Sequence, residues 1–249
     1  MRLPRPTPHT PMPDVAGALN FRDVGGLPAG AGETRRGVLF RSGNLARVGA
    51  AGREAIRTLG LRRIVDLRED EEIAFEPTDL GDLPVTTRRV PLFAGSATSF
   101  FAQDVTLDAL YRTLVDESAP AIVEVVRSVI DEAPVLVHCT VGKDRTGVTV
   151  ALTLAAAGVD EDAIVADYAR TEALLPPDRN ARVLAYLQRL HPEARNLADL
   201  ATRSPAPVMR ALLDDLHARY GAPVEFLRAN GLADDELREL RRVLIAGGS

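Results

Sequence analysis

The stretch HCTVGKDRTG, residues 138–147, shows most about how this chain folds. An apolar run that favours a β-strand, residues 134–137, leads into it, and a run that favours a helix, residues 146–157, leads out. A strand that passes through a tight loop directly into a helix points the N–H groups of the loop at one place. The positive end of the helix dipole faces the same place. The sequence therefore predicts a binding site for an anion of the size of phosphate.

Two side chains in this loop have the chemistry to act on a bound phosphate. Cys139 stands at the start, where its sulfur could attack phosphorus, and the helix N-terminus together with Lys143 and Arg145 favours the anionic form of sulfur. Arg145 follows after five intervening residues, so its guanidinium can bind two phosphate oxygens at once. Gly142 and Gly147 allow the backbone to approach closely. We therefore expect Cys139 to be the nucleophile and Arg145 to bind phosphate and stabilise the transition state.

The other residues of the loop are expected to bind the phosphate or to support the loop. The Thr146 hydroxyl, just inside the helix, could donate a hydrogen bond to the sulfur and make it a better leaving group. His138 is expected to brace the loop through a ring nitrogen. The predicted phosphate-binding set is His138, Thr140, Val141, Gly142, Lys143, Thr146 and Gly147.

These residues resemble a known signature. Cys-x5-Arg followed by Thr-Gly and preceded by His resembles that of the cysteine-dependent protein tyrosine phosphatases, and HCxxGKDRTG resembles their atypical bacterial and fungal branch. The segments NFRDVGG (20–26), LFRSGN (39–44) and IVDLR (64–68) also fit this branch. The resemblance implies an α/β fold with a central, mostly parallel sheet flanked by helices and a helical lid. It also implies activity on phosphotyrosine and, in some members, on phosphoserine, phosphothreonine and phosphoinositides.

The general acid has two candidates. Cleavage of a phosphomonoester needs a proton for the leaving oxygen and then a base that activates water. The chain has no tryptophan, so it lacks the Trp-Pro-Asp loop that carries the acid in many tyrosine phosphatases. Asp144, inside the loop, is the first candidate, and the resemblance supports it. Asp66 is the second, because it lies at the end of a predicted strand, residues 63–67, where ligands bind in α/β sheets; a structural carboxylate is an equal reading.

Lys143 bears on the substrate. A lysine at this place in the signature is also seen in phosphoinositide phosphatases, which suggests that it attracts a polyanionic head group. The simpler interpretation is that its charge supports the thiolate. Both interpretations are kept.

Composition sets further limits on function. The net charge of −5 argues against non-specific binding of nucleic acid. No apolar run reaches the roughly 20 residues that cross a bilayer, and the first residues do not form a Sec signal. We therefore expect a cytoplasmic protein, with secretion by another route left open. The four histidines are scattered and a phosphocysteine mechanism needs no metal or cofactor, so we expect neither. The oligomeric state cannot be read from the sequence.

The chain is expected to form a single phosphatase domain over residues 15–249, after a flexible proline-rich arm over residues 1–14. Some part of residues 160–205 is the expected lid. Phe93, Phe100 and Phe101 could line a substrate entrance or pack in the core. The acidic run at 69–76 is expected to be a solvated helix start. Other predicted helices cover 49–59, 107–115, 119–131 with Pro120 near its start, 180–190, 208–220, 223–229 and 234–246.

The main functional prediction is a phosphoric monoester hydrolase that works through a phosphocysteine. Its expected partner is a phosphorylated protein or a phosphoinositide. One alternative is an enzyme that acts chiefly on phosphoinositides, and another is a phosphate-binding module without catalysis. Sulfur transfer, as in rhodaneses, is a third, although the DRTG ending and the paired glycines disfavour it.

Overall fold

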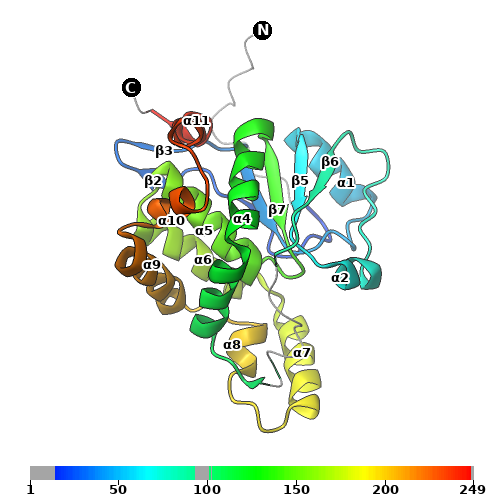
Figure 1. Cartoon of the computed structure of the whole chain (residues 1–249). Helices are drawn as coiled ribbons and strands as arrows, with labels where there is room; N and C mark the ends of the chain where they lie inside the picture. Colours follow the sequence, from blue (N-terminus) through cyan, green and yellow to red (C-terminus); the bar gives the residue numbers. More distant parts are fainter. Residues whose placement is uncertain (1–14, 93–100, 102, 248–249) are drawn as a thin grey trace.

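The computed structural model describes residues 15–92, 101 and 103–247, and a five-stranded sheet forms its centre (Figure 1). The strand order is β1-β4-β7-β5-β6. The last four strands run parallel, and β1 is antiparallel to β4. This confirms the predicted, mostly parallel sheet. The strands are β1 (Arg22–Asp23), β4 (Leu39–Ser42), β5 (Arg63–Asp66), β6 (Thr86–Arg89) and β7 (Val135–His138).

Helices cover both faces of this sheet. Figure 1 shows α1 on one side of the strands and α4, α5, α6, α9, α10 and α11 on the other, while α2 lies below the strands. Within the described ranges, every helix is too short or too polar to cross a bilayer. The helices are α1 (Ala50–Leu59), α2 (Asp70–Phe75), α4 (Leu107–Glu132), α5 (Asp144–Ala157), α6 (Glu161–Leu174), α7 (Pro177–Leu190), α8 (Leu197–Ala201), α9 (Ala206–Tyr220), α10 (Pro223–Ala229) and α11 (Asp234–Leu244).

Strand β7 is buried on both faces because its residues alternate between two clusters. Leu136 packs with Phe40 and Ile64 in the cluster that includes α1. Val135 and Val137 belong to the larger core formed with α4 and α5. Successive side chains of a strand point to opposite faces, so an uninterrupted apolar run is what a central parallel strand requires. The loop after β7 therefore starts from the middle of the fold.

Helix α4 differs from the prediction of two helices. It is one helix of 26 residues with Pro120 inside it. Proline cannot donate the backbone hydrogen bond of a helix interior, which is why a boundary was expected there. The helix continues because Val115, Ala119 and Ile122, on both sides of the proline, are buried in the same core.

Residues 245–246 form a strand where the sequence pattern predicted the end of a helix. Helix α11 ends at Leu244, and β8 (Ile245–Ala246) pairs with β3 (Gly32–Thr34), which also pairs with β2 (Pro28–Ala29). All three strands are two or three residues long, so they show no periodicity of their own.

Helices α7 and α8, here called the cap (residues 177–201), project from the body of the molecule (Figure 1). Leu187, Leu197 and Ala201 form a small buried cluster of their own, against which Phe101 packs. The preceding helix α6 belongs to the main core. The cap thus accounts for the later part of the segment in which a lid was predicted. The predicted arm at 1–14, Phe93 and Phe100 lie outside the described residues.

Candidate active site

The loop after β7 depends on a position that favours glycine. Gly142 has φ of +75°, in the left-handed region, and a Cβ there would lie 2.4 Å from the carbonyl carbon of Ser42. Its N–H donates to Cys139 Sγ at 3.3 Å, and Cys139 is only 3% exposed. Helix α5 begins at Asp144, so its N-terminus follows directly. The strand, loop and helix thus have the arrangement that binds an anion.

Buried side chains from the N-terminal part of the chain hold this loop from behind. Asn20 Nδ2 and Arg41 Nη2 donate to the carbonyl oxygen of Gly142 at 2.8 and 2.9 Å. Asp167 on α6 pairs with Arg41 at 2.8 Å and with Arg22 at 2.7 Å. Burial works to raise the pKa of Asp167, but the two guanidinium groups lower it overall. These contacts agree with a structural role for both arginines.

Arg145 is fixed by a carboxylate from the acidic run that we expected to be solvated. Glu72 Oε2 accepts from Arg145 Nη1 and Oε1 accepts from Nη2, both at 2.6 Å. The Thr140 hydroxyl donates to Oε1, and the backbone N–H of Glu69 donates to Oε2 at 2.9 Å. Burial works to raise the pKa of Glu72, but hydrogen bonds and charge from Arg145 outweigh it and lower the pKa to about 2. Glu72 therefore stays ionised and positions the guanidinium.

Asp144 is held through one of its two carboxylate oxygens. The Tyr111 hydroxyl donates to Oδ1 at 2.8 Å, and Lys143 Nζ donates to the same oxygen at 2.6 Å. The Tyr168 hydroxyl lies 2.7 Å from that of Tyr111. Burial raises the pKa of both tyrosines, so both keep their protons. Oδ2 accepts no hydrogen bond from any described residue, which leaves it available to a substrate.

Lys143 is buried although it also lines the main cavity. Besides Asp144, its ammonium group donates to the backbone oxygen of Asp199 in α8, at 3.1 Å. In this conformation the Lys143 ammonium group is bound by Asp144 and by the Asp199 backbone oxygen of the protein itself. Attraction of a head group by Lys143 therefore stays a prediction.

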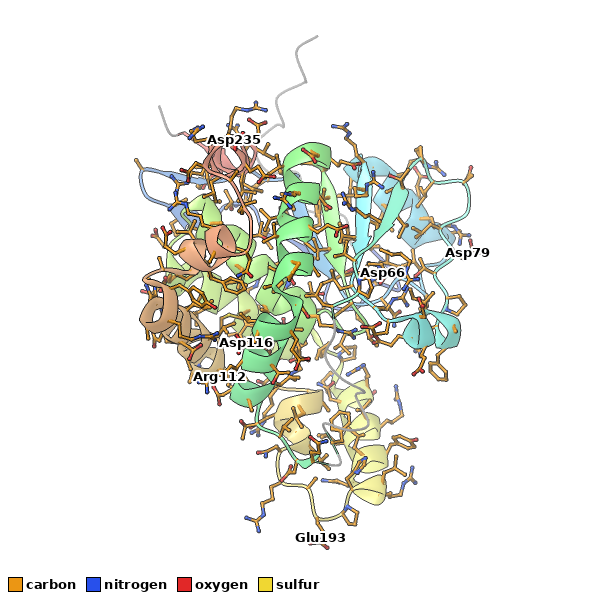
Figure 2. All side chains as sticks on the ribbon, viewed as in Figure 1. Asp66, Asp79, Arg112, Asp116, Glu193 and Asp235 are labelled. Atoms are coloured by element: carbon orange, nitrogen blue, oxygen red, sulfur yellow. The ribbon has the colours of Figure 1, made fainter. Side chains whose placement is uncertain are left out.

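Asp66 has a different environment from Asp144. Arg68 Nε donates to Asp66 Oδ1 at 2.9 Å and Arg68 Nη2 to Oδ2 at 2.7 Å. His138 Nε2 lies 3.7 Å from Oδ2, and His138 Nδ1 lies 3.3 Å from the oxygen of Cys139. Burial works to raise the pKa of Asp66, but Arg68 and His138 lower it overall. Asp66 ends β5 within the fold (Figure 2) and does not line the main cavity, so these contacts favour a structural role.

The remaining loop residues are closely packed. Thr146 Oγ1 is buried and has no hydrogen-bond partner among the described residues, so the predicted bond to sulfur is not formed here. A Cβ on Gly147 would lie 3.1 Å from the Tyr168 ring and 3.3 Å from Arg41 Nη2. Glycine at this position therefore allows Tyr168 and Arg41 to pack against the start of α5. Val141 lines the cavity.

The loop faces a cavity of about 760 Å³ with mostly apolar walls. This volume suits a small-molecule or side-chain substrate. Phe101 forms part of the wall and also packs against the cap cluster, so it combines the two roles considered from the sequence. The loop supplies Thr140, Val141, Lys143, Asp144 and Arg145; α2 and the residue before it supply Glu69, Glu71, Glu72 and Phe75; α4 supplies Leu110 and Leu114; and the cap supplies Arg179, Arg182, Val183, Tyr186, Leu187, Leu200 and Ala201.

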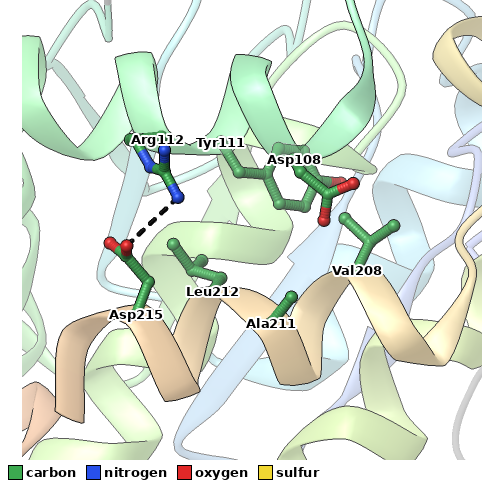
Figure 3. Close-up of a pocket in the computed structure, with 7 residues that line it drawn as sticks. All are labelled: Asp108, Tyr111, Arg112, Val208, Ala211, Leu212 and Asp215. Carbon is green, nitrogen blue, oxygen red and sulfur yellow. Dashed lines mark hydrogen bonds and ion pairs between the residues drawn. The ribbon is translucent and has the colours of Figure 1, made fainter. Parts of the chain in front are cut away.

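A second cavity lies between α4 and α9 and is much smaller, about 40 Å³ (Figure 3). Arg112 and Asp215 form an ion pair at 3.2 Å across it. The space holds little more than a water molecule or two. It is therefore too small for a phosphorylated substrate.

Glu72 and Tyr111 are the functional candidates that sequence reasoning missed. Glu72 lies just beyond the carboxyl end of β5, the edge where α/β sheets bind ligands, and this was a usable signal. Tyr111 is an aromatic residue on an otherwise ordinary amphipathic helix, and nothing local distinguishes it from a core residue.

The chain is similar to known proteins over most of its length. Residues 13–246 match the model of a family described as the tyrosine phosphatase family. The triple specificity protein phosphatase PtpB of Mycobacterium tuberculosis is 31% identical over 275 residues, which cover 93% of this chain and 98% of that protein. A tyrosine-protein phosphatase of Nostoc commune is 30% identical over 214 residues, which cover 81% of this chain and 72% of that protein.

Among solved structures, the core catalytic domain of the PP-IP phosphatase SIW14 from S. cerevisiae aligns with a TM-score of 0.41 and 17% identity. The alignment covers 74% of this chain and 90% of that domain.

Proposed function

The chain belongs to the tyrosine phosphatase family, and we propose that it hydrolyses phosphotyrosine in proteins through a phosphocysteine on Cys139. The observation that supports this proposal is that Cys139 and Arg145 belong to the same strand–loop–helix turn, from β7 into α5. The sulfur accepts an N–H from its own loop, and Glu72 holds the guanidinium that would bind the phosphate. Phosphoserine, phosphothreonine and phosphoinositides are proposed as further substrates, because the mycobacterial relative is named a triple specificity phosphatase.

The proposed reaction has two steps. The thiolate of Cys139 attacks phosphorus, an S–P bond forms while the P–O bond to the alcohol breaks, and Asp144 gives its proton to the leaving oxygen. Asp144 then takes a proton from water, the water oxygen attacks phosphorus, and the S–P bond breaks. Phosphate leaves and the thiolate returns. Arg145 and the loop N–H groups stabilise the charge on the phosphoryl oxygens in both steps.

The cavity supports an aromatic substrate. Leu110 and Leu114 on one wall and Val183 and Leu187 on another provide apolar surface in front of the loop. A phenyl ring that enters between them loses contact with water, which favours binding. The relative from Nostoc commune is named a tyrosine-protein phosphatase, which points to the same substrate class.

A trapping experiment tests the proposal. Rapid quenching of the wild type with a phosphopeptide labelled in its phosphate should leave the label on residue 139, and Cys139→Ser should retain binding but lose turnover. Normal turnover by Cys139→Ser would overturn the proposed mechanism. Binding of the phosphopeptide without turnover by the wild type would identify a phosphate-binding module instead.

Phosphoinositides are the second candidate because Arg179 and Arg182 add positive charge to the cavity beyond the reactive loop. A chief preference for lipid predicts a higher kcat/KM on phosphoinositides than on phosphopeptides. It also predicts that Lys143→Ala weakens phosphoinositide turnover more than p-nitrophenyl phosphate turnover. Equal losses on the two substrates would remove Lys143 from the lipid argument.

A further inference from the structure

The most exposed large apolar side chains of the described chain gather at the mouth of the main cavity. Phe75 is 86% exposed, Tyr186 55% and Leu190 54%. Phe75 on α2 and Tyr186 on α7 line the cavity from different elements. Leu190 follows Tyr186 by four residues, so it lies next to it on α7. Exposed apolar groups that gather around a binding site mark an interaction surface.

Three arginines lie on the same face of α7 as Tyr186 and Leu190. Positions 179, 182, 186, 189 and 190 are separated by three, four, three and one residues, a spacing that keeps them along one side of a helix. Among the described residues, Arg179, Arg182 and Arg189 have no carboxylate ion-pair partner. The helix carries these three arginines against one acidic residue, Asp178, in a chain with a net charge of −5. Positive charge is therefore concentrated on α7.

We propose that this face of α7, together with Phe75, is a docking surface for an anionic lipid bilayer. Here the docking face means Phe75, Arg179, Arg182, Tyr186, Arg189 and Leu190. The inference rests on the proposed phosphatase function, because docking would place the cavity mouth over a phosphomonoester in a lipid head group.

The mixture of arginine with aromatic and aliphatic residues on one face is what favours a bilayer as the partner. At a membrane interface, Tyr186 and Leu190 enter the boundary between head groups and acyl chains, while arginine stems lie along that boundary and their charges reach the phosphates. Figure 1 shows that α7 projects from the body of the molecule, so a flat surface can approach it. Glu69 and Glu71 line the cavity on the α2 side. The electrostatic attraction to an anionic bilayer must therefore come from the arginines of α7.

Co-sedimentation with vesicles tests docking without any need for turnover. The vesicles are phosphatidylcholine alone, or phosphatidylcholine with about one fifth phosphatidylserine. The test variant is the double change Arg189→Glu with Leu190→Ser, because both residues are exposed on the docking face and neither lines the cavity. The matched control is Arg238→Glu on α11, an exposed arginine at the opposite end of the molecule from the cap (Figure 2 labels the nearby Asp235).

We expect the wild type to sediment with the anionic vesicles and not with phosphatidylcholine alone. The double variant should bind about tenfold more weakly, because it reverses one charge and removes one apolar contact. Arg238→Glu should bind like the wild type. All three proteins should hydrolyse p-nitrophenyl phosphate at similar rates, which shows that they are folded.

Two results would overturn the docking surface. One is an absence of sedimentation with anionic vesicles by a wild type that is active on p-nitrophenyl phosphate, and the proposed phosphatase function would then survive. The other is unchanged vesicle binding by the double variant. If that variant also lost kcat/KM on a phosphopeptide, the same face would bind protein substrates rather than lipid.

Discussion

Asp144 and Glu72 both line the main cavity, but they differ in how many of their carboxylate oxygens accept hydrogen bonds. Glu72 accepts hydrogen bonds on both oxygens, two of them from Arg145. Asp144 accepts from Tyr111 and Lys143 on Oδ1, while Oδ2 has no partner among the described residues. A carboxylate that must exchange a proton needs a free oxygen, and one that must position a guanidinium needs both. Their contacts therefore fit the two roles that we propose for them.

The Asp144→Asn variant should still bind phosphate but should no longer transfer a proton to the leaving oxygen. We expect kcat on an alkyl phosphate to fall by about 10²-fold or more, because a general acid contributes roughly that much. The loss on p-nitrophenyl phosphate should be smaller, since that leaving group needs little protonation. Steady-state kinetics on the two substrates measure the difference. Full activity of Asp144→Asn on the alkyl phosphate would exclude Asp144 as the acid.

Glu72→Gln should disturb Arg145 and change the dependence of stability on pH. The pKa of Glu72 is lowered from 4.5 to about 2 in the folded chain, so its ion pair stabilises the fold fully above pH 4.5. That contribution is lost as the pH falls from 4.5 through about 2. In urea unfolding, the wild type should have a higher free energy of unfolding than Glu72→Gln above pH 4.5. The difference should shrink as the pH is lowered through this range.

The same variant should also lose activity at neutral pH. When Glu72 no longer fixes the Arg145 guanidinium, kcat/KM should fall by roughly ten- to a hundredfold. This is the scale expected for a misplaced substrate-binding group. A variant with unchanged activity and an unchanged pH profile of stability would show that Glu72 does not position Arg145.

Among single residues, the sequence could indicate those whose expected roles depend on residues close to them in the chain. Cys139, Gly142 and Arg145 lie within one loop, so their spacing could be interpreted directly. Glu72 and Tyr111 meet that loop from positions 73 and 33 residues away from their partners. Such pairs form only when α2 and α4 pack in place, which no local pattern shows.

Among the elements, local signals located the long helices and central strands well and failed where packing overrides them. Gly60 ends α1 in the left-handed conformation, as a glycine after a helix predicts. Pro120 was expected to mark a helix boundary, but α4 continues through it. The burial of apolar residues on both sides of the proline outweighs the lost hydrogen bond. The short strand β8 depends on pairing with β3, which is distant in sequence.

Pro120→Ala should therefore stabilise the protein. Pro120 is exposed within α4, and proline costs about 3 kcal/mol relative to alanine inside a helix. We expect a gain of about 2 kcal/mol, or a rise in Tm of roughly 4–8 °C for a chain of this size. Differential scanning calorimetry measures it. Pro177→Ala is the control, because proline is well accommodated at the first position of α7. A lower Tm for Pro120→Ala would contradict the prediction.

For the whole molecule, one buried ionic network joins parts that are far apart in sequence. Asp167 on α6 holds Arg22 of β1 and Arg41 of β4, and Arg41 with Asn20 holds the loop at Gly142. No local sequence pattern could identify Asp167 as the partner of these arginines, because it lies 145 residues from Arg22. The network thus couples the position of α6 to the loop after β7.

Asp167→Asn should destabilise the fold and impair the loop. It leaves two buried guanidinium groups without their carboxylate, a change that costs about 3–5 kcal/mol. Urea denaturation should show this loss, and kcat/KM should fall because the support of Gly142 weakens. Glu193→Gln, an exposed change at the tip of the cap (Figure 2), should alter neither. A loss below 1 kcal/mol for Asp167→Asn would show that the network is not essential.

The separate cluster of Leu187, Leu197 and Ala201 has a consequence for how this molecule can diversify. A pair of helices that shares so few core residues with the sheet can be lengthened, recharged or exchanged in descendants while the reaction chemistry stays intact. Selection for a new phosphoester would then act first on that appendage, and the short loop between β7 and α5 would persist unchanged.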